Sequence, residues 1–133
     1  MTAVALVGLL GLVVLQTSAE IPAPVSEVLA ALQDAVQQFA VEEEIDDFTL
    51  DDLLDSGLEA QPLDDGQGCL LNGVKVWLLN GKHRIFVVHW QGLWYLLELR
   101  GWKVFRVEGA SEPDEAGRLF RTGKAVFVGK LRQ

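Results

Sequence analysis

The sequence predicts an α+β fold, in which an antiparallel β-meander of five to six strands (residues 68–131) packs against one amphipathic N-terminal helix. Apolar residues recur at three- and four-residue spacing over about 26–40, which is typical of one side of a helix. Short apolar runs separated by Asn-Gly, Gln-Gly and Arg-Gly pairs follow, which is typical of strands joined by tight turns. Half of the 133 residues are hydrophobic, enough for one core and too many for a disordered polar chain. We therefore expect a single small domain over residues 20–133.

Residues 1–19 form an apolar N-terminal segment ahead of this domain. Its uninterrupted apolar run, residues 3–15, would cover only about 20 Å as a helix, which is short of the roughly 30 Å hydrocarbon core of a bilayer. Residues 17–19 resemble a small-residue cleavage site, but no Lys or Arg precedes the run as a signal peptide would require. Three interpretations stay open: a signal-like or anchoring segment, a buried core element, and an apolar segment that docks on a partner.

The helix at 26–40 is the clearest local prediction. Residues 21–24 (Ile-Pro-Ala-Pro) read as a stiff extended link, because each proline restricts its own φ and that of its predecessor. Ser26 can then cap the helix. Apolar side chains occupy one side of it and Gln and Asp the other, so one side is available for burial.

The segment 42–56 sets a few apolar side chains among many acidic ones, with Thr49 and Asp52 spaced as a helix-capping pair and Gly57 as a stop. We prefer the interpretation of a solvated acidic helix that packs its leucines on the domain. The alternative is a docking segment. Its partner-binding side chains would be Ile45, Phe48, Leu50, Leu53 and Leu54. Residues 57–68, rich in Gly, Asp and Pro, read as a linker into the second half.

The second half predicts a strand meander with a polar loop at 111–117 before its last strand. Asn72-Gly73 and Asn80-Gly81 are strong signals for two-residue hairpins, and Gln91-Gly92 and Arg100-Gly101 follow at similar intervals. The expected strands are 68–71, 74–79, 82–90, 93–99, 102–108 and 124–131.

Two-residue turns determine which residues share a face of this sheet. Trp77 would lie opposite Arg84, Tyr95 opposite Arg106, and Glu98 opposite Lys103, an opposite-charge pair that supports the register. One face becomes nearly pure hydrocarbon, and we expect helix 26–40 to cover it. That face consists of Val74, Val76, Leu78, Ile85, Val87, Trp94, Leu96, Phe105 and Val107.

The opposite face combines aromatic and cationic side chains, which suits anionic or aromatic ligands. Its candidate partner-binding residues are Lys75, Trp77, Arg84, Trp90, Tyr95, Trp102 and Arg106. We prefer the structural interpretation, a second small core with the cationic side chains at its rim, because so much exposed aromatic area would otherwise need a cover. Either interpretation requires a cover or a partner for this face.

The charges are divided unequally along the chain. Residues 1–65 hold 14 acidic residues and no Lys or Arg, whereas residues 66–133 hold all 11 basic residues and five acidic ones. The net charge of −8 therefore combines −14 in the first half with +6 in the second. Halves of opposite sign attract each other or recruit different partners.

The sequence predicts no enzyme, cofactor or metal site. His83 and His89 would lie on one strand about 20 Å apart, too far to share a metal ion. Cys69 is the single cysteine, so it forms no intramolecular disulfide, and we expect a small buried hydrophobic residue there. No glycine pattern matches a phosphate-binding loop.

These features favour a non-enzymatic interaction or assembly protein. It would dock on a larger protein complex or a membrane surface through residues 3–15, the acidic segment and the aromatic-basic face. One alternative is a single-stranded nucleic-acid-binding module with an acidic autoinhibitory segment, which the sequence pI of 4.6 disfavours. Another is an exported domain cleaved after Ala19, although a cytoplasmic or membrane-associated protein is favoured.

Overall fold

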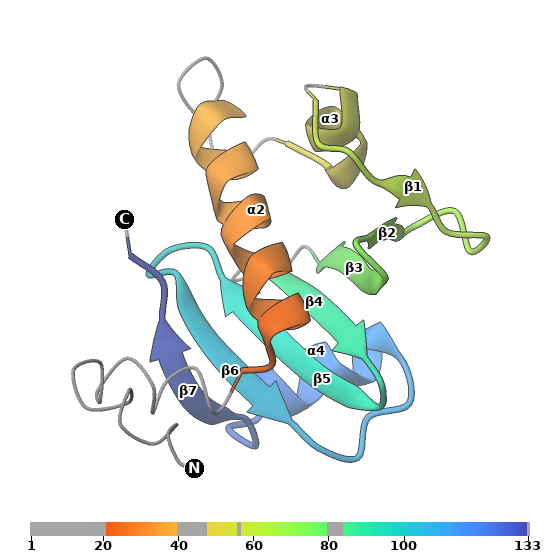
Figure 1. The fold of residues 1–133 in the computed structure, drawn as a ribbon. Coiled ribbons are helices and arrows are strands. Elements are labelled where there is room, and N and C mark those ends of the chain that lie inside the picture. The colour runs from red at the N-terminus through yellow and green to blue at the C-terminus, as the bar shows by residue number, and fades with distance from the viewer. Residues whose placement is uncertain (1–20, 40–47, 56, 80–83, 133) are drawn as a thin grey trace, which may run out of the picture.

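A computed structural model describes residues 21–39, 48–55, 57–79 and 84–132 of the chain. Its centre is a seven-stranded antiparallel sheet whose strands follow one another in chain order, which confirms the α+β meander (Figure 1). The elements are α2 (Ala23–Phe39), α3 (Leu50–Asp55), β1 (Gln61–Pro62), β2 (Cys69–Leu71), β3 (Val74–Leu79), β4 (Ile85–Trp90), β5 (Leu93–Glu98), β6 (Lys103–Val107), α4 (Pro113–Arg121) and β7 (Val126–Lys130).

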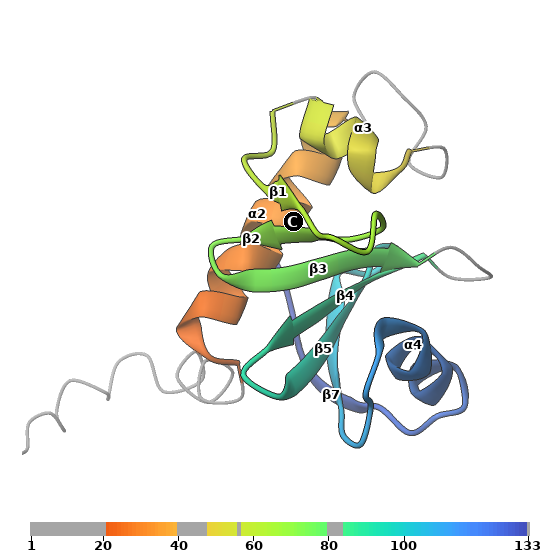
Figure 2. The same ribbon diagram turned by 90° about the vertical axis from the view of Figure 1, so that its right-hand side faces the viewer.

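The two longer helices lie on opposite faces of the sheet, α2 on one and α4 on the other (Figure 2). Helix α2 confirms the predicted helix and buries its apolar side, Val25, Val28, Leu29, Leu32 and Val36. Gln33, on the same helix, donates a hydrogen bond from Nε2 to the carbonyl oxygen of Arg132 at 2.6 Å, which links α2 to the chain just after β7. The domain therefore has one sheet with a covered core on each side.

Helix α2 begins three residues earlier than the expected capping residue Ser26, at Ala23. The prediction of an extended link over residues 21–24 was therefore wrong at Ala23 and Pro24, which are helical. A proline in the first turn of a helix lacks only an N–H that has no intrahelical acceptor, so Pro24 is compatible with this start. The Ser26 N–H bonds to the Pro22 carbonyl at 2.9 Å as part of that first turn.

The β3–β4 register differs from the predicted one. Leu79 pairs with Ile85 and Trp77 with Val87, a register that a two-residue turn at Asn80-Gly81 would not give. Residues 80–83 themselves lie outside the described residues. Strand β3 carries apolar residues on both of its sides, so its hydrophobic pattern did not distinguish the two registers. A change of three residues in the pairing exchanges the faces of β3 relative to β4, β5 and β6.

Helix α2 consequently covers the β4–β6 part of the face that we expected on the other side of the sheet. Val76 of β3 joins Val88 and Tyr95 beneath α2, whereas Trp77 joins Val87 and Trp94 on the α4 side. The predicted hydrocarbon face is therefore divided. Its β3 members lie under α2, and its members on β4, β5 and β6 lie under α4.

Helix α4 occupies the place of the predicted polar loop at 111–117, a prediction that was wrong. Pro113 stands in its first turn, where a proline is tolerated. Gly117 faces the sheet, and a Cβ built there would lie 2.6 Å from Cδ1 of Leu79. The glycine thus permits close contact between α4 and β3 in a segment that was predicted to be a polar loop.

The remaining turns confirm the predicted pairing. Leu71 pairs with Val74 and Trp90 with Leu93, so Asn72-Gly73 and Gln91-Gly92 are two-residue turns, with positive φ at all four residues. Beyond the third turn, Glu98 pairs with Lys103 and Tyr95 with Arg106 as expected. The sheet from β4 to β6 therefore has the register that the turn residues predict.

Candidate functional site

The residues proposed as an aromatic-basic face do not share one face. Trp90, Tyr95 and Trp102 belong to the core on the α2 side, whereas Trp77 lies in the core on the α4 side. The exposed fractions of Trp77, Tyr95 and Trp102 are 7%, 2% and 5%. These three rings are core residues and present no aromatic platform to a ligand, which corrects the expectation of one ligand-binding face.

Trp77 is held by a loop that precedes β2. Its indole Nε1 donates to Oδ2 of Asp65 at 2.9 Å, while Oδ1 of Asp65 accepts the backbone N–H groups of Gln67 and Gly68 at 2.9 and 3.0 Å. These three donors lower the pKa of the exposed Asp65 carboxyl, and Lys75 adds a smaller effect of the same sign. Asp65 thus acts as a clasp that closes this loop over β3.

Arg84 lies just before β4, away from the predicted position opposite Trp77. Its guanidinium donates to the carbonyl oxygen of Phe48, and its Cζ lies 4.4 Å from the centroid of the Phe48 ring. Phe48 also contacts Phe39 at the end of α2, with ring centroids 5.6 Å apart. Arg84 therefore ties the start of the α3 segment to the sheet.

The apolar residues of the acidic segment contribute to the domain's own core. Phe48, Leu50 and Leu53 are buried there and Leu54 packs against it. Ile45 lies outside the described residues, as do residues 3–15. Thr49 and Asp52 exchange backbone-to-side-chain hydrogen bonds at 2.8 and 3.2 Å, so the predicted capping pair is confirmed. The docking interpretation of these buried side chains is replaced by the packing one.

The candidates for chemistry occupy structural positions. His89 stacks on Trp94, with ring centroids 4.1 Å apart, and burial together with Lys75 lowers its pKa. Burial raises the pKa of the Cys69 thiol to about 11, so the reactive thiolate is scarce at neutral pH. His83 lies outside the described residues. Over the described ranges, no three potential metal ligands gather in one place.

Strand β7 is the most exposed apolar feature of the described chain. It is an outer strand of the sheet, bonded to β6 on one side. Val126 and Phe127 are exposed to 54% and 55%, although the Phe127 ring also contacts Phe105 at a centroid distance of 5.7 Å. An outer strand presents unpaired backbone N–H and C=O groups along its free side. Strand β7 thus offers both backbone and apolar groups to another molecule.

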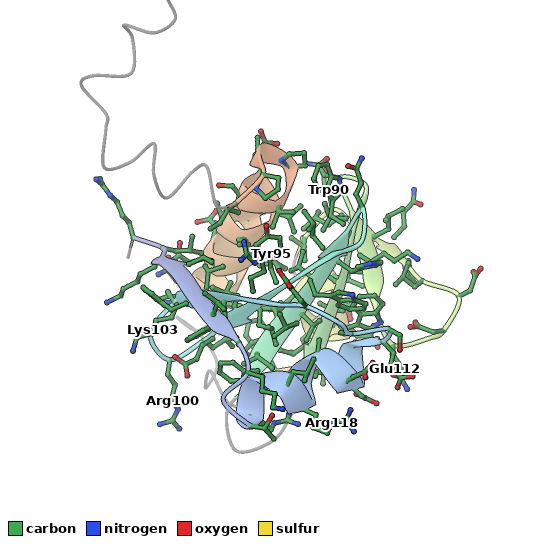
Figure 3. All side chains as sticks on the ribbon, turned by 90° about the horizontal axis from the view of Figure 1, so that it is seen from below. Trp90, Tyr95, Arg100, Lys103, Glu112 and Arg118 are labelled. Carbon is green, nitrogen blue, oxygen red and sulfur yellow. The ribbon has the colours of Figure 1, made fainter. Side chains whose placement is uncertain are left out.

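Cationic residues are frequent in the part of the chain that contains this strand. Residues 116–133 contain five Lys or Arg residues and no Asp or Glu. Lys130 of β7 lies directly opposite Lys103 of β6, and Lys103 and Arg100 lie on the β7 side of the molecule (Figure 3). Two like charges at one cross-strand position are unfavourable by themselves. We refer to Val126, Phe127, Lys103, Lys124 and Lys130 as the β7 surface; all five side chains are exposed.

A shallow cavity of about 490 Å³ adjoins the start of β7 on the α2 side. Tyr95 and Arg106, the predicted cross-strand pair, line it, and Val126 is the β7 partner of Arg106. Leu93, with 37% of its surface exposed, also lines the cavity. Of the predicted sheet-face residues, the structure therefore brings Tyr95 and Arg106 next to the β7 surface.

A second groove, of about 640 Å³, lies between the end of α2, the chain after α3 and the β2–β3 turn. Its charged lining residues are acidic, Asp34 and Glu59. It lies on the side of the fold where the acidic half of the chain packs, away from the cations of the β7 surface. The division of charge in the sequence therefore persists in the folded domain.

The sequence contains a signal for the β7 surface that is independent of which residues share a face of the sheet. Strand 124–131 was predicted, and the last strand of a meander is by topology an outer strand. Its apolar centre, Val126-Phe127-Val128, lies between Lys124 and Lys130. The edges of a predicted sheet, as well as its faces, therefore carry a signal for this surface.

Comparisons of the chain with protein-family models, with curated proteins and with solved structures found no match. Within the described ranges, no helix has the length and apolar character needed to cross a bilayer. Function is therefore inferred from the geometry of the β7 surface.

Proposed function

We propose that this chain is a non-enzymatic interaction protein that docks on a larger protein through the β7 surface. The observation that carries the proposal is the exposure of Val126 and Phe127 on a strand that, among the described residues, pairs with β6 alone. Proteins commonly protect such edges, because an exposed apolar edge strand readily pairs with another chain. An edge left open in this way is suited to adding a strand from a partner, a common mode of peptide recognition.

The cavity at Tyr95 and Arg106 extends this surface around the edge of the sheet. A partner strand alongside β7 would alternate its side chains between the two faces. On the α2 side they would approach Val126 and the cavity, and on the α4 side they would approach Phe127. Backbone pairing would supply affinity, and these two sides would supply selectivity.

The single-stranded nucleic-acid alternative has less support. Recognition of single strands uses exposed aromatic faces on which bases stack. Trp77, Tyr95 and Trp102 are almost fully buried, and Phe127 is the aromatic side chain that is more than half exposed among the described residues. The cations around β7 are then better explained by an acidic protein partner than by a stacking platform.

Site-specific photo-crosslinking in cells tests the proposal. A photoreactive phenylalanine analogue at position 127 should give discrete covalent adducts with another protein. The same analogue at Glu27, an exposed position on α2, serves as the control. Adding Val126→Asp should abolish the adducts at position 127, because it places a charge on the apolar edge. Adducts at 127 that match those at position 27, or that persist with Val126→Asp, would contradict docking through β7.

A further inference from the structure

We infer that the partner segment which pairs with β7 is an extended acidic peptide that also carries apolar side chains. This inference rests on the proposed function and adds the chemistry of the partner. It is drawn from the order in which exposed apolar residues and cations follow one another along β7. The apolar residues Val126 and Phe127 stand at its start, and Lys130 stands at its end.

The strongest argument is the pairing of Lys103 with Lys130. Both side chains are exposed at one cross-strand position, and like charges placed so are mutually destabilising. Glu98 compensates on the other flank of Lys103, as its β5 partner, but the β7 flank carries Lys130. An acidic side chain on a strand added beyond β7 would lie next to Lys130 and complete an alternation of charge across the strands.

The electrostatic field of the residues that flank β7 is also positive. Lys124, Lys130 and Arg132 follow one another without an intervening acid, whereas Arg118 of α4 pairs with Glu115 at 3.5 Å. Like-signed charges spread along a docking surface speed the encounter with an oppositely charged partner and disfavour similarly charged ones. An acidic peptide is therefore attracted before any backbone pairing forms.

A second copy of this chain is a poorer occupant of the β7 edge in the register that centres the two β7 strands on each other. In an antiparallel β7–β7 pair centred on Val128, Lys124 of each copy would face Arg132 of the other, and Lys130 would face Val126. Such a pair brings like charges together at both ends, which is unfavourable. A partner with acids at those positions avoids this repulsion.

The experiment uses the full chain labelled with ¹⁵N and two synthetic peptides of equal length. One alternates valine with glutamate and the other alternates valine with lysine. Binding is followed by chemical-shift changes and by amide hydrogen exchange over residues 126–130. The valine-glutamate peptide should protect β7 amides and weaken with added salt. The valine-lysine peptide should bind at least about tenfold more weakly.

Charge reversal at one residue supplies a matched pair of variants. Lys130→Glu should weaken binding of the valine-glutamate peptide roughly fivefold, because it replaces an attraction with a repulsion. Lys75→Glu, on the exposed surface of β3, changes net charge identically and should leave that affinity unchanged. Thermal unfolding should show both variants folded, since Lys130→Glu also converts the Lys103 pair into an opposite-charge pair.

Each other outcome overturns a stated part of the inference. Equal protection of β7 by both peptides rejects the acidic partner and leaves docking through β7 standing. If neither peptide protects β7 amides at millimolar concentration, both the acidic partner and docking through β7 are rejected. Tighter binding of single-stranded oligothymidylate at the same amides rejects the peptide in favour of nucleic acid. Protection that rises with protein concentration without any peptide rejects it in favour of a second copy.

Discussion

The two edges of the sheet are built in opposite ways. Strand β1 has two residues, one of which, Pro62, has no backbone N–H to offer, and acids flank it. Strand β7 has five residues, no proline, two exposed apolar side chains, flanking lysines, and a register shift against β6 at Val104/Phe105. Short strands, prolines, lysines and bulges are all devices that hinder strand addition, and β7 lacks the first two. The contrast supports the proposal that β7, and not β1, is the edge to which a partner strand adds.

The largest expected difference between these regions comes from the same substitution at two phenylalanines. Phe48, 1% exposed, anchors the chain ahead of α3, so Phe48→Ala should lower the free energy of unfolding by about 3–5 kcal/mol. Phe127 is 55% exposed on β7, so Phe127→Ala should change it by less than about 1 kcal/mol.

Urea unfolding followed by tryptophan fluorescence measures both values. The comparison also separates packing from docking as the role of the acidic segment. A stability loss at Phe48 no larger than that at Phe127 would show that Phe48 is not a core residue.

The next largest effect on stability is expected in the loop between β1 and β2, which lies against Trp77. A Cβ on Gly68 would lie 2.6 Å from Nε1 of Trp77 and 2.8 Å from the backbone oxygen of Val76. Because that oxygen cannot move without disturbing β3, Gly68→Ala should cost about 1–3 kcal/mol. The matched control is Gly101→Ala, where the nearest atom is Cε of Lys103 at 3.4 Å.

We expect Gly101→Ala to alter stability by less than about 0.5 kcal/mol. Thermal unfolding of both variants checks the prediction. Equal melting temperatures for the two variants would mean that the loop adjusts freely around Trp77, and that the hydrogen bonds of Asp65 do not hold the loop in place over β3.

The sequence predicted elements well where a local rule determined the outcome. The Asn72-Gly73 turn and the Glu98–Lys103 pair follow from two-residue geometry and complementary charge. Helix α4 was not recognised because Gly117 has a tertiary role, contact with Leu79, that no local pattern shows. The β3–β4 register was likewise determined by packing, because β3 is apolar on both sides.

The candidate site was predicted less well, for a related reason. Assigning Trp77 and Arg84 to one face depended on a single turn, and one wrong turn moved a whole strand's side chains to the other face. The Tyr95–Arg106 pair depended on other turns and was confirmed as a pair. The assignment of residues to one face of a meander is therefore correct only if the length of every turn between their strands is predicted correctly.

A smaller effect is expected from the ionisation of Asp65. Its hydrogen bonds with Trp77, Gln67 and Gly68 lower the pKa below the ordinary 3.8, so its carboxylate form favours the folded state. This contribution is present above about pH 4 and is lost as pH falls through the lowered folded pKa. Asp65→Asn should thus reduce stability at pH 7 and flatten its decline in acid.

Unfolding of the native chain and of Asp65→Asn across this range measures the difference. Asp64→Asn, a neighbouring exposed acid, serves as the control. Parallel acid profiles for the native chain and Asp65→Asn would rule out the clasp as a source of the pH dependence.

The smallest expected effect lies on β3 and β4, between the two edges. Burial and, secondarily, Lys75 lower the pKa of His89 below 6.5, so the neutral imidazole stacked on Trp94 favours the folded state. The resulting stability is present above pH 6.5 and is lost as pH falls through the lowered folded pKa. Lys75→Gln should raise the pKa of His89 only part of the way, because burial is the larger cause and remains. A ¹⁵N NMR titration of the imidazole measures this shift, with Lys103→Gln on the β7 surface as the control. Since Lys75 is the directly paired neighbour of His89 and Lys103 is not, an equal response to both substitutions would mean that the total charge of the domain, and not this cross-strand pair, determines the ionisation of His89.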